Sequence, residues 1–264
     1  MLRPRIVPCL LISKGGLVKT KGFKSPKYVG DPINAVKIFN EKEVDELIVL
    51  DIDATVTGVE PDYRLIEKLA QECRMPLCYG GGITESSQAF RIMESGVEKV
   101  ALGASAIVKP NLLGKISAGA GSQSVVAVLD VRKRKGIFSS GYQIYTHNGN
   151  KSQNGNPIEV AGDLQRAGAG EILVNSIDHD GEMLGYDLEL ARLVSEKVSV
   201  PTTFLGGAGS TDHMIDLVTV CGTVGVAAGS LFVFKGKYRA VLINYPSVSQ
   251  RDEISQAARA LQSK

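Results

Sequence analysis

The sequence predicts a single α/β domain in which eight parallel strands close into a barrel and alternate with helices. Short apolar segments recur with helical patterns between them, no Pro/Ser-rich linker divides the chain, and the two halves of the sequence resemble each other. Parallel strands covered by helices are buried on both faces and read as continuous apolar runs. The length of 264 residues is usual for one such barrel.

The eight expected strands are separated by segments long enough for one helix each. They are Arg5–Ile12, Leu47–Ile52, Met75–Tyr79, Lys99–Gly103, Ser124–Val131, Glu171–Ser176, Val200–Leu205 and Thr223–Ala227. Helix starts are marked between them: Asp31 can cap free N–H groups, and Pro32 stands at the first helical position. Asp187 gives a similar signal before a helix expected over Leu188–Val198.

An internal repeat decides the architecture. The segment PLCYGGG at 76–82 resembles PTTFLGG at 201–207, and the same displacement relates Glu46 to Glu171 and Asp53 to Asp178. Each half then holds four βα units. Two fused halves predict one (βα)8 TIM barrel over residues 1–264, with half-barrels at about 1–120 and 121–264.

Composition describes an ordinary globular protein, with 44% hydrophobic residues, 22% charged residues and a formal charge of +2. Neither nucleic acid nor membrane is expected as a partner, because no basic tract and no apolar run of about 20 residues occurs. Cytoplasm is the expected location. Cys9, Cys73, Cys78 and Cys221 lack metal-ligand spacing, so they are expected to be reduced, and neither a metal nor a cofactor is expected.

Glycine clusters follow four of the expected strands, where backbone N–H groups can approach an anion. In the first half they supply the phosphate- or substrate-binding candidates Gly81, Gly82 and Gly103, and in the second half Gly207, Gly229 and Ser230. Two related sites suit a small molecule phosphorylated at both ends. The alternative is that these glycines only fit tight turns; their paired arrangement favours the phosphate sites.

Carboxylates stand at the ends of buried strands. Asp130 follows four apolar residues, and a buried carboxylate is costly unless it is hydrogen-bonded or used. Barrel enzymes keep catalytic groups at this rim, so Asp130 is the best general acid/base candidate. The related strand of the first half carries Leu11 instead. Other acids at these ends can also cap helices or bind loop amides: Asp51, Asp53, Asp178 and Asp180.

Lysines crowd the segment after the first strand, at Lys19, Lys21, Lys24 and Lys27, together with several glycines. We expect a flexible basic loop that covers the rim as a lid, with Lys19 contacting the substrate. A solvated loop surface is the alternative.

Charged residues also stand at four strand starts, at the opposite end of the barrel. Arg5 and Lys99 with Glu46 and Glu171 could close the floor as a salt-bridged ring. The alternative is that these side chains face solvent.

Together these features resemble the HisF family, the cyclase subunit of imidazole glycerol phosphate synthase, over essentially the whole chain. The matching segments include RIVPCL at 5–10, GGGI at 80–83, GAGEIL at 168–173, SIDHDG at 176–181, GYD at 185–187 and GGAG at 206–209.

The resemblance implies a glutamine amidotransferase (HisH-like) partner on the amino-terminal face of the barrel and ammonia passing along its axis. Family members then cyclise a doubly phosphorylated ribulosyl-formimino carboxamide nucleotide at the rim. The residues that match the family's ammonia gate are Arg5, Glu46, Lys99 and Glu171. Those that match its phosphate sites are Gly81 and Gly82, and Asp180, Gly181, Gly207, Gly229 and Ser230. Asp130 matches one of two catalytic aspartates.

The chain departs from the family at three positions of the rim: Leu11 replaces the other catalytic aspartate, Gly103-Ala104 replaces an Asn-Thr pair, and Leu205 replaces a small polar residue. Three hypotheses follow. The leading one is a HisF-like paralogue serving acetamidino modification of surface (O-antigen) sugars in lipopolysaccharide. The others are an imidazole glycerol phosphate synthase cyclase of histidine biosynthesis and a non-catalytic, ammonia-channelling scaffold. Whether the barrel is itself an enzyme stays open at this point.

Overall fold

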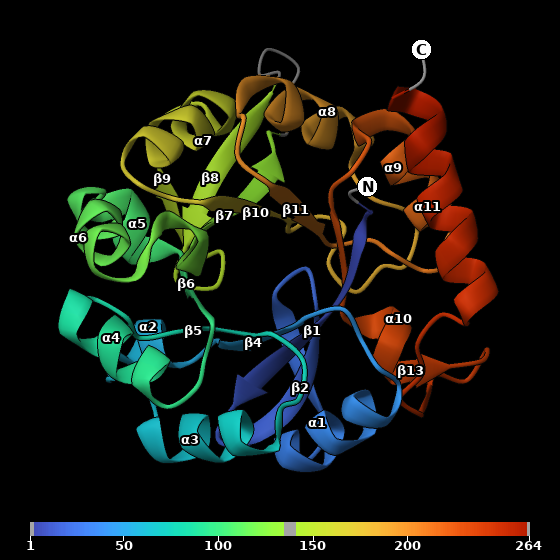
Figure 1. Ribbon diagram of the computed structural model, residues 1–264, viewed down its shortest axis with the longest axis horizontal. Coiled ribbons are helices and arrows are strands. Elements are labelled where there is room, and N and C mark those ends of the chain that lie inside the picture. Colours follow the sequence, from blue (N-terminus) through green and yellow to red (C-terminus); the bar gives the residue numbers. More distant parts are fainter. Residues whose placement is uncertain (1–2, 135–140, 263–264) are drawn as a thin grey trace.

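Eight parallel strands close into a barrel, as predicted (Figure 1). The computed structural model describes residues 3–134 and 141–262, so the ends of the predicted domain at 1–2 and 263–264 lie outside it. Each barrel strand pairs with two neighbours, and β12 closes the circle by pairing with β1. The strands are β1 (Arg5–Ser13), β4 (Leu47–Asp51), β5 (Leu77–Gly80), β6 (Lys99–Leu102), β7 (Val125–Lys133), β10 (Glu171–Ser176), β11 (Thr202–Leu205) and β12 (Gly225–Ala228).

Helices surround the barrel (Figure 1). The main ones are α1 (Pro32–Glu41), α3 (Tyr63–Glu72), α4 (Ser86–Glu94), α6 (Asn111–Ala120), α7 (Pro157–Arg166), α8 (Leu188–Lys197), α9 (Thr211–Cys221) and α11 (Val248–Gln262). Short helical segments follow three of the strands, namely α2 (Ala54–Thr57), α5 (Ala104–Val108) and α10 (Ser230–Val233), and a 3₁₀ turn, η1 (Ser122–Ser124), precedes β7. The predicted caps are confirmed, because Asp31 accepts from Asn34 N at 2.8 Å and Asp187 from Leu190 N at 3.0 Å.

Several strand limits differ from the prediction. The third and seventh strands begin two residues later than expected, directly after Pro76 and Pro201, whose carbonyls accept bonds from neighbouring strands but which have no N–H to donate. The eighth strand also begins two residues late, at Gly225. The first and fifth strands run past their predicted ends because each continues into an antiparallel partner.

These partners are hairpins that rise from the carboxyl ends of the barrel strands. The segment predicted as a flexible loop is a hairpin of β2 (Gly16–Lys21) and β3 (Lys24–Gly30), so the predicted loop is wrong, whereas its role as a lid stays a prediction. Its turn is tied down because Gly22 N donates to Asp180 O at 3.0 Å. Additional strands are β8 (Tyr142–Thr146), β9 (Lys151–Gln153), β13 (Phe234–Lys235) and β14 (Ala240–Val241).

Two apolar layers hold the fold together. The outer layer lies between strands and helices and contains fully buried side chains such as Phe39, Leu69 and Ile92. The inner layer fills the barrel itself. Because successive side chains of a strand point to opposite faces, alternate residues belong to the two layers. The buried inner set is Val7, Cys9, Ile48, Cys78, Ala101, Val126, Val128, Leu173, Leu205 and Ala227.

Candidate functional site

The inward-facing residues of the barrel form three levels. Strand alternation places Arg5 below Val7, and Glu171 below Leu173, on the inner face. It places Leu11 and Asn175 above them. A charged floor, an apolar middle and a mixed upper level therefore follow one another along the barrel axis.

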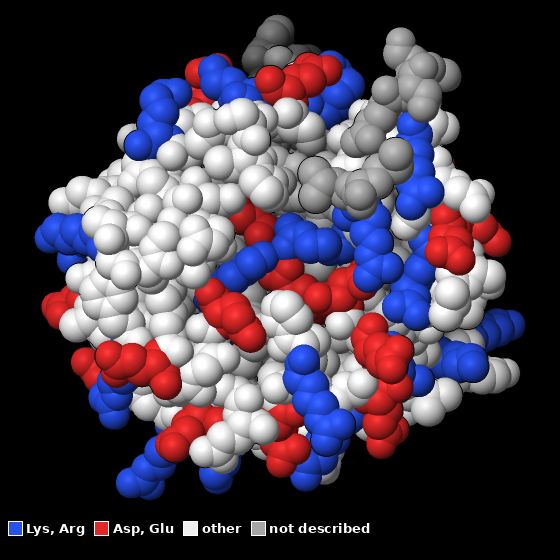
Figure 2. Space-filling model, viewed as in Figure 1, with Lys and Arg blue, Asp and Glu red and all other residues white. Residues whose placement is uncertain are grey.

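The floor is a closed ring of two cations and two anions. Arg5 bonds to Glu46 through Nη1 and to Glu171 Oε1 through Nη2, the latter at 2.7 Å. Lys99 Nζ donates to Glu46 Oε1 and to Glu171 Oε2, both at 2.8 Å. Figure 2 shows basic and acidic side chains gathered at the centre of this face. The side chains that sequence reasoning allowed to face solvent instead face one another.

Mutual attraction keeps this ring charged although it is largely buried. Burial alone would raise the pKa of Glu171, but Arg5 and Lys99 lower it to about 2. Burial opposes charge on Arg5 and Lys99 as well, and the two glutamates more than offset it, so both cations have raised pKa values. Arg5, Lys99 and Glu171 are thus charged at neutral pH.

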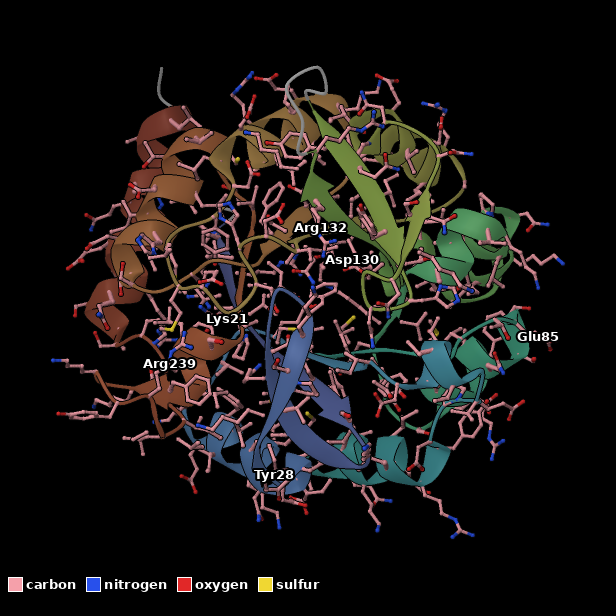
Figure 3. The ribbon with its side chains drawn as sticks, turned by 180° about the vertical axis from the view of Figure 1, so that it is seen from behind. Lys21, Tyr28, Glu85, Asp130, Arg132 and Arg239 are labelled. Carbon is pink, nitrogen blue, oxygen red and sulfur yellow. The ribbon has the colours of Figure 1, made fainter. Side chains whose placement is uncertain are left out.

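The upper level opens into a pocket of about 1150 Å³ of empty space, its mouth included. Figure 3 views this face, with Asp130 near the barrel axis and Arg132 beside it. The pocket brings together most of the predicted rim residues. Those lining it are Lys19, Gly81, Gly103, Asp130, Asp180, Gly181, Gly207, Gly229 and Ser230. Gly82 is not among them, although it follows Gly81 directly.

The two halves of the pocket carry different side chains at one pair of related positions on neighbouring strands. On β7 and β10, Asp130 lies beside Asn175, whose Nδ2 donates to Asp130 Oδ1 at 3.3 Å. On β1 and β4, the related pair is Leu11 beside Leu50. Both pairs line the pocket. One half therefore presents a hydrogen-bonded carboxylate and the other presents two aliphatic side chains.

Asp130 is a carboxylate in an apolar setting. Burial, with a smaller contribution from the charge of Asp180, raises its pKa to about 7 against the lowering effect of the Asn175 hydrogen bond. A carboxyl group with a pKa near neutrality can both give and take a proton.

The glycine turns leave backbone donors at the pocket or, in the case of Gly82, next to it. Within the described chain, the N–H groups of Gly82 and Ala104, and of Gly207 and Ser230, donate no recorded hydrogen bond. Such groups can bind an anion. The backbone also needs glycine for its own shape, because φ is 122° at Gly81 and 109° at Gly207. Turn geometry and anion binding are therefore compatible explanations.

Lys19 reaches the second set of donors. Its side chain is 5% exposed, and Nζ donates to Cys9 O at 2.7 Å. A Cβ atom on Gly229 would lie only 2.8 Å from this Nζ, so glycine is what lets the ammonium approach the backbone there. Burial lowers the pKa of Lys19. Lys19 lies beside Gly207, Gly229 and Ser230, and we call these four residues the cationic corner of the pocket. Among the described residues, no buried lysine lies beside the glycines of the first half, Gly81 and Gly103.

Asp180 is already engaged with the hairpin. Its Oδ2 accepts from Thr20 Oγ1 at 2.6 Å and from Phe23 N at 3.1 Å, and its neighbour Glu182 forms an ion pair with Lys21. The backbone of Gly181 passes so close to Thr20 O that a side chain would not fit. Asp180 and Gly181 therefore hold the hairpin across the pocket.

The remaining strand-end acids bind loop amides. Asp53 accepts from Lys14 N at 2.9 Å, and Asp178 accepts from Lys133 N at 2.9 Å, at related positions of the two halves. Asp51 accepts from Asp53 N and Ala54 N. These contacts agree with the alternative stated for these acids in the sequence analysis, namely that they cap helices or bind loop amides.

Sequence reasoning missed a strap across the mouth of the pocket. The turn between β8 and β9 carries His147 and Asn148, which line the pocket, and Asn148 Nδ2 donates to Ile52 O at 2.7 Å on the far side. Both residues have positive φ, 54° and 56°. The tripeptide His-Asn-Gly at 147–149 is a turn signal, but nothing in it indicates that the turn reaches over the barrel.

Two absences hold for residues 3–134 and 141–262. No group of three or more His, Cys, Asp or Glu side chains is arranged to hold a metal ion. No helix there is long and apolar enough to cross a membrane.

Fold and pocket together define a TIM-barrel protein with a closed ionic floor and a ligand pocket at the carboxyl ends of its strands. Comparison with known proteins narrows this class. A family model described as "Histidine biosynthesis protein" matches residues 5–239.

The most similar relatives include three proteins with provisional names as imidazole glycerol phosphate synthase subunits. HisF of Leptospira borgpetersenii is 50% identical over 254 residues, 96% of this chain and 99% of its own. The subunit hisF3 of Vibrio vulnificus (strain YJ016) is 55% identical over 251 residues, 95% and 96% of the two chains. The subunit hisF2 of Pseudomonas aeruginosa PAO1 is 51% identical over 252 residues, 96% and 99%. The chain belongs to the HisF family, which confirms the resemblance inferred from the sequence.

The ring predicts a dependence of stability on acid. Because the pKa of Glu171 falls from its usual 4.5 to about 2 on folding, its ionisation stabilises the fold above pH 4.5, and this stability is lost as pH falls toward 2. Between pH 5 and pH 2 the free energy of unfolding should fall by about 3 kcal/mol more for the natural chain than for Glu171→Gln. Denaturant titrations measure this, with exposed Glu159→Gln as control; equal slopes in all three proteins would contradict it.

Asp130 predicts the opposite dependence. Its pKa rises from 3.8 to about 7 on folding, so its neutral form contributes stability below pH 3.8, and that contribution is lost as pH rises through 7. Asp130→Asn should therefore gain stability relative to the natural chain between pH 4 and pH 8, on the order of 3 kcal/mol. Chemical unfolding at both pH values tests this, with exposed Asp163→Asn as control. Parallel profiles would show that Asp130 is not held in an apolar setting.

Proposed function

We propose that this chain is the synthase-type subunit of a glutamine amidotransferase complex, a HisF-like paralogue that admits ammonia at its floor and delivers it to the pocket. We further propose that it serves acetamidino modification of bacterial surface sugars rather than histidine synthesis. The observation that carries this proposal is the Leu11–Leu50 pair, which stands where the related pair is Asp130–Asn175. A leucine cannot transfer a proton, so the two-carboxylate arrangement of the histidine-pathway cyclase is absent.

The order of the charged floor, the apolar middle and the pocket along the barrel axis supports the proposed ammonia path. Above the floor ring the barrel interior is lined by small and aliphatic side chains as far as the pocket. Neutral ammonia crosses such an interior at little cost, whereas ammonium loses its hydration. Within the part of the chain that the structure describes, the ring at the floor is the strongly polar step between the amino-terminal face and this interior.

A partner subunit is supported by the family. Each relative's name calls it a subunit of a synthase, and two carry numbered names, hisF2 and hisF3, as paralogues do. The partner we propose is a glutamine amidotransferase that docks over the floor, so that ammonia released there enters between Arg5 and Lys99.

The substrate we propose is a small phosphorylated molecule. Lys19 with the backbone donors at Gly207 and Ser230 suits one phosphate group, and the donors at Gly82 and Ala104 suit a second, more weakly held anion. The hairpin, held by Asp180, covers the bound molecule.

The retained cationic corner also favours a second function, the histidine-pathway cyclase with Asp130 alone carrying proton transfer. Loss of one member of an acid/base pair commonly costs on the order of 10² to 10⁴ in rate. A third function, a scaffold without turnover of its own, is favoured by the apolar replacements Leu11 and Leu205.

An ammonium-driven assay with the ribulosyl-formimino carboxamide nucleotide separates these functions. We expect the natural chain to turn it over far below roughly 1 s⁻¹, a rate typical of biosynthetic enzymes, and Leu11→Asp to gain activity because it restores a second carboxylate. The matched control is Leu10→Asp, one residue away and facing the outer layer. Turnover by the natural chain at an ordinary enzymatic rate would refute the paralogue proposal.

Competition between two nitrogen sources tests the floor. The complex with its amidotransferase is supplied with amide-¹⁵N glutamine and unlabelled ammonium, and the label in the aminated product is measured by mass spectrometry. Lys99→Ala opens the ring and leaves Glu46 and Glu171 to share the single charge of Arg5, so the labelled fraction should fall several-fold. Lys197→Ala, at an exposed ion pair, is the control. An unchanged fraction in Lys99→Ala would argue against entry through the ring.

A further inference from the structure

A buried threonine hydroxyl completes the floor ring on one side. Thr203 lies on β11, is 0% exposed, and faces the barrel interior as Leu205 does two residues later. Its Oγ1 donates to Glu171 Oε1 at 2.6 Å and accepts from Arg5 Nη2 at 3.2 Å. Since Arg5 Nη2 also donates to Glu171 Oε1 at 2.7 Å, the three groups bond to one another in a closed triangle.

The neighbouring strand is shaped around this hydroxyl. Thr203 pairs with Gly225 on β12, and a Cβ atom on Gly225 would lie 1.9 Å from Thr203 Oγ1. Any side chain at 225 would push the hydroxyl out of the triangle. Gly225 on β12 therefore leaves the space that the Thr203 hydroxyl on β11 occupies, so both strands contribute to the triangle.

The other glutamate of the ring has no such support. Glu46 is held by Arg5 and Lys99 alone, and among the described residues no hydroxyl bonds to it. At the position related to Thr203 in the first half of the sequence stands Cys78, a buried thiol with no recorded hydrogen bond to the ring. The ring therefore has a side with one additional anchor, at Glu171, and a side without it, at Glu46.

We propose that Thr203 is a fifth, positioning member of the ring, which fastens Glu171 to Arg5 so that the floor opens on the side of Glu46. Parting Glu171 from Arg5 and Lys99 would break two ion pairs and also at least one of the two hydrogen bonds that Thr203 Oγ1 makes to charged groups, and such bonds are among the stronger ones. Parting Glu46 from Arg5 and Lys99 breaks ionic contacts only, and leaves both cations bound to Glu171. A small neutral molecule would then pass beside Glu46.

This inference rests on the proposed entry of ammonia through the floor for its purpose, but the fastening is a property of the ring itself. It can be measured on the isolated chain by the reactivity of Cys78. Cys78 belongs to the inner layer near the ring, is fully buried, and does not line the pocket. Cys9 belongs to the same layer but lines the pocket, so it reports access from the other end of the barrel.

The probe is methyl methanethiosulfonate, a small neutral thiol reagent, with modification of each cysteine followed by peptide mass spectrometry. Thr203→Val removes the hydroxyl and keeps the shape, so labelling of Cys78 should accelerate on the order of tenfold while labelling of Cys9 stays the same. Thr203→Ser keeps the hydroxyl and should return the Cys78 rate close to that of the natural chain. Thr202→Val, on the outer face of the same strand, should leave both rates unchanged.

Three results would overturn the proposal: an unchanged Cys78 rate in Thr203→Val, an equal acceleration at Cys9, or a serine variant as reactive as the valine variant. If valine prevents folding, Thr203→Ala removes the same hydroxyl without placing a new methyl group against Arg5, and the same expectations apply.

The labelling experiment needs neither ammonia nor a partner. A fast Cys78 in Thr203→Val together with an unchanged nitrogen competition in Lys99→Ala would uphold the fastening and reject ammonia entry. The converse pair of results would reject the fastening alone.

Discussion

The floor ring is the interaction on which the organisation of this barrel depends. Four ionised side chains can stay in a largely buried site because each one contacts two of opposite charge. Removing any single member would leave an uncompensated charge in a poorly solvated place, which is far more costly than losing an exposed ion pair. The ring thereby separates solvent on the amino-terminal face from the apolar interior above it.

The apolar lining of the pocket gives the upper level its chemistry. Asp130 has a pKa near 7 because its neighbours on the inner face are aliphatic, and Leu11, Leu50 and Leu205 extend that setting around the pocket. The same replacements that take away a second carboxylate therefore leave the remaining one poised between its two protonation states. The absence of a carboxylate at Leu11 and the raised pKa of Asp130 therefore both follow from the apolar character of the pocket.

Much of this arrangement could be predicted because it follows from periodicity. The barrel, its repeat, the caps at Asp31 and Asp187, and the inward direction of Arg5, Glu46, Lys99 and Glu171 depend on spacing within the chain. Contacts between segments far apart in the sequence could not be predicted from periodicity. The hairpin after β1 was mistaken for a flexible loop because the partner that fixes it, Asp180, comes far later in the sequence. The roles of Thr203 and Asn148 were hidden for the same reason, since each depends on a neighbour chosen by barrel closure rather than by sequence.

The two structures that cross the pocket run in opposite directions. The hairpin starts from the first strand and is held by Asp180 after the sixth, whereas the strap starts beyond the fifth strand and is held at Ile52 after the second. Residues of both crossings line the pocket, so early and late parts of the chain meet around it. For the small phosphorylated molecule proposed above, entry and release would then be coupled to hydrogen bonds that connect the early and late parts of the chain.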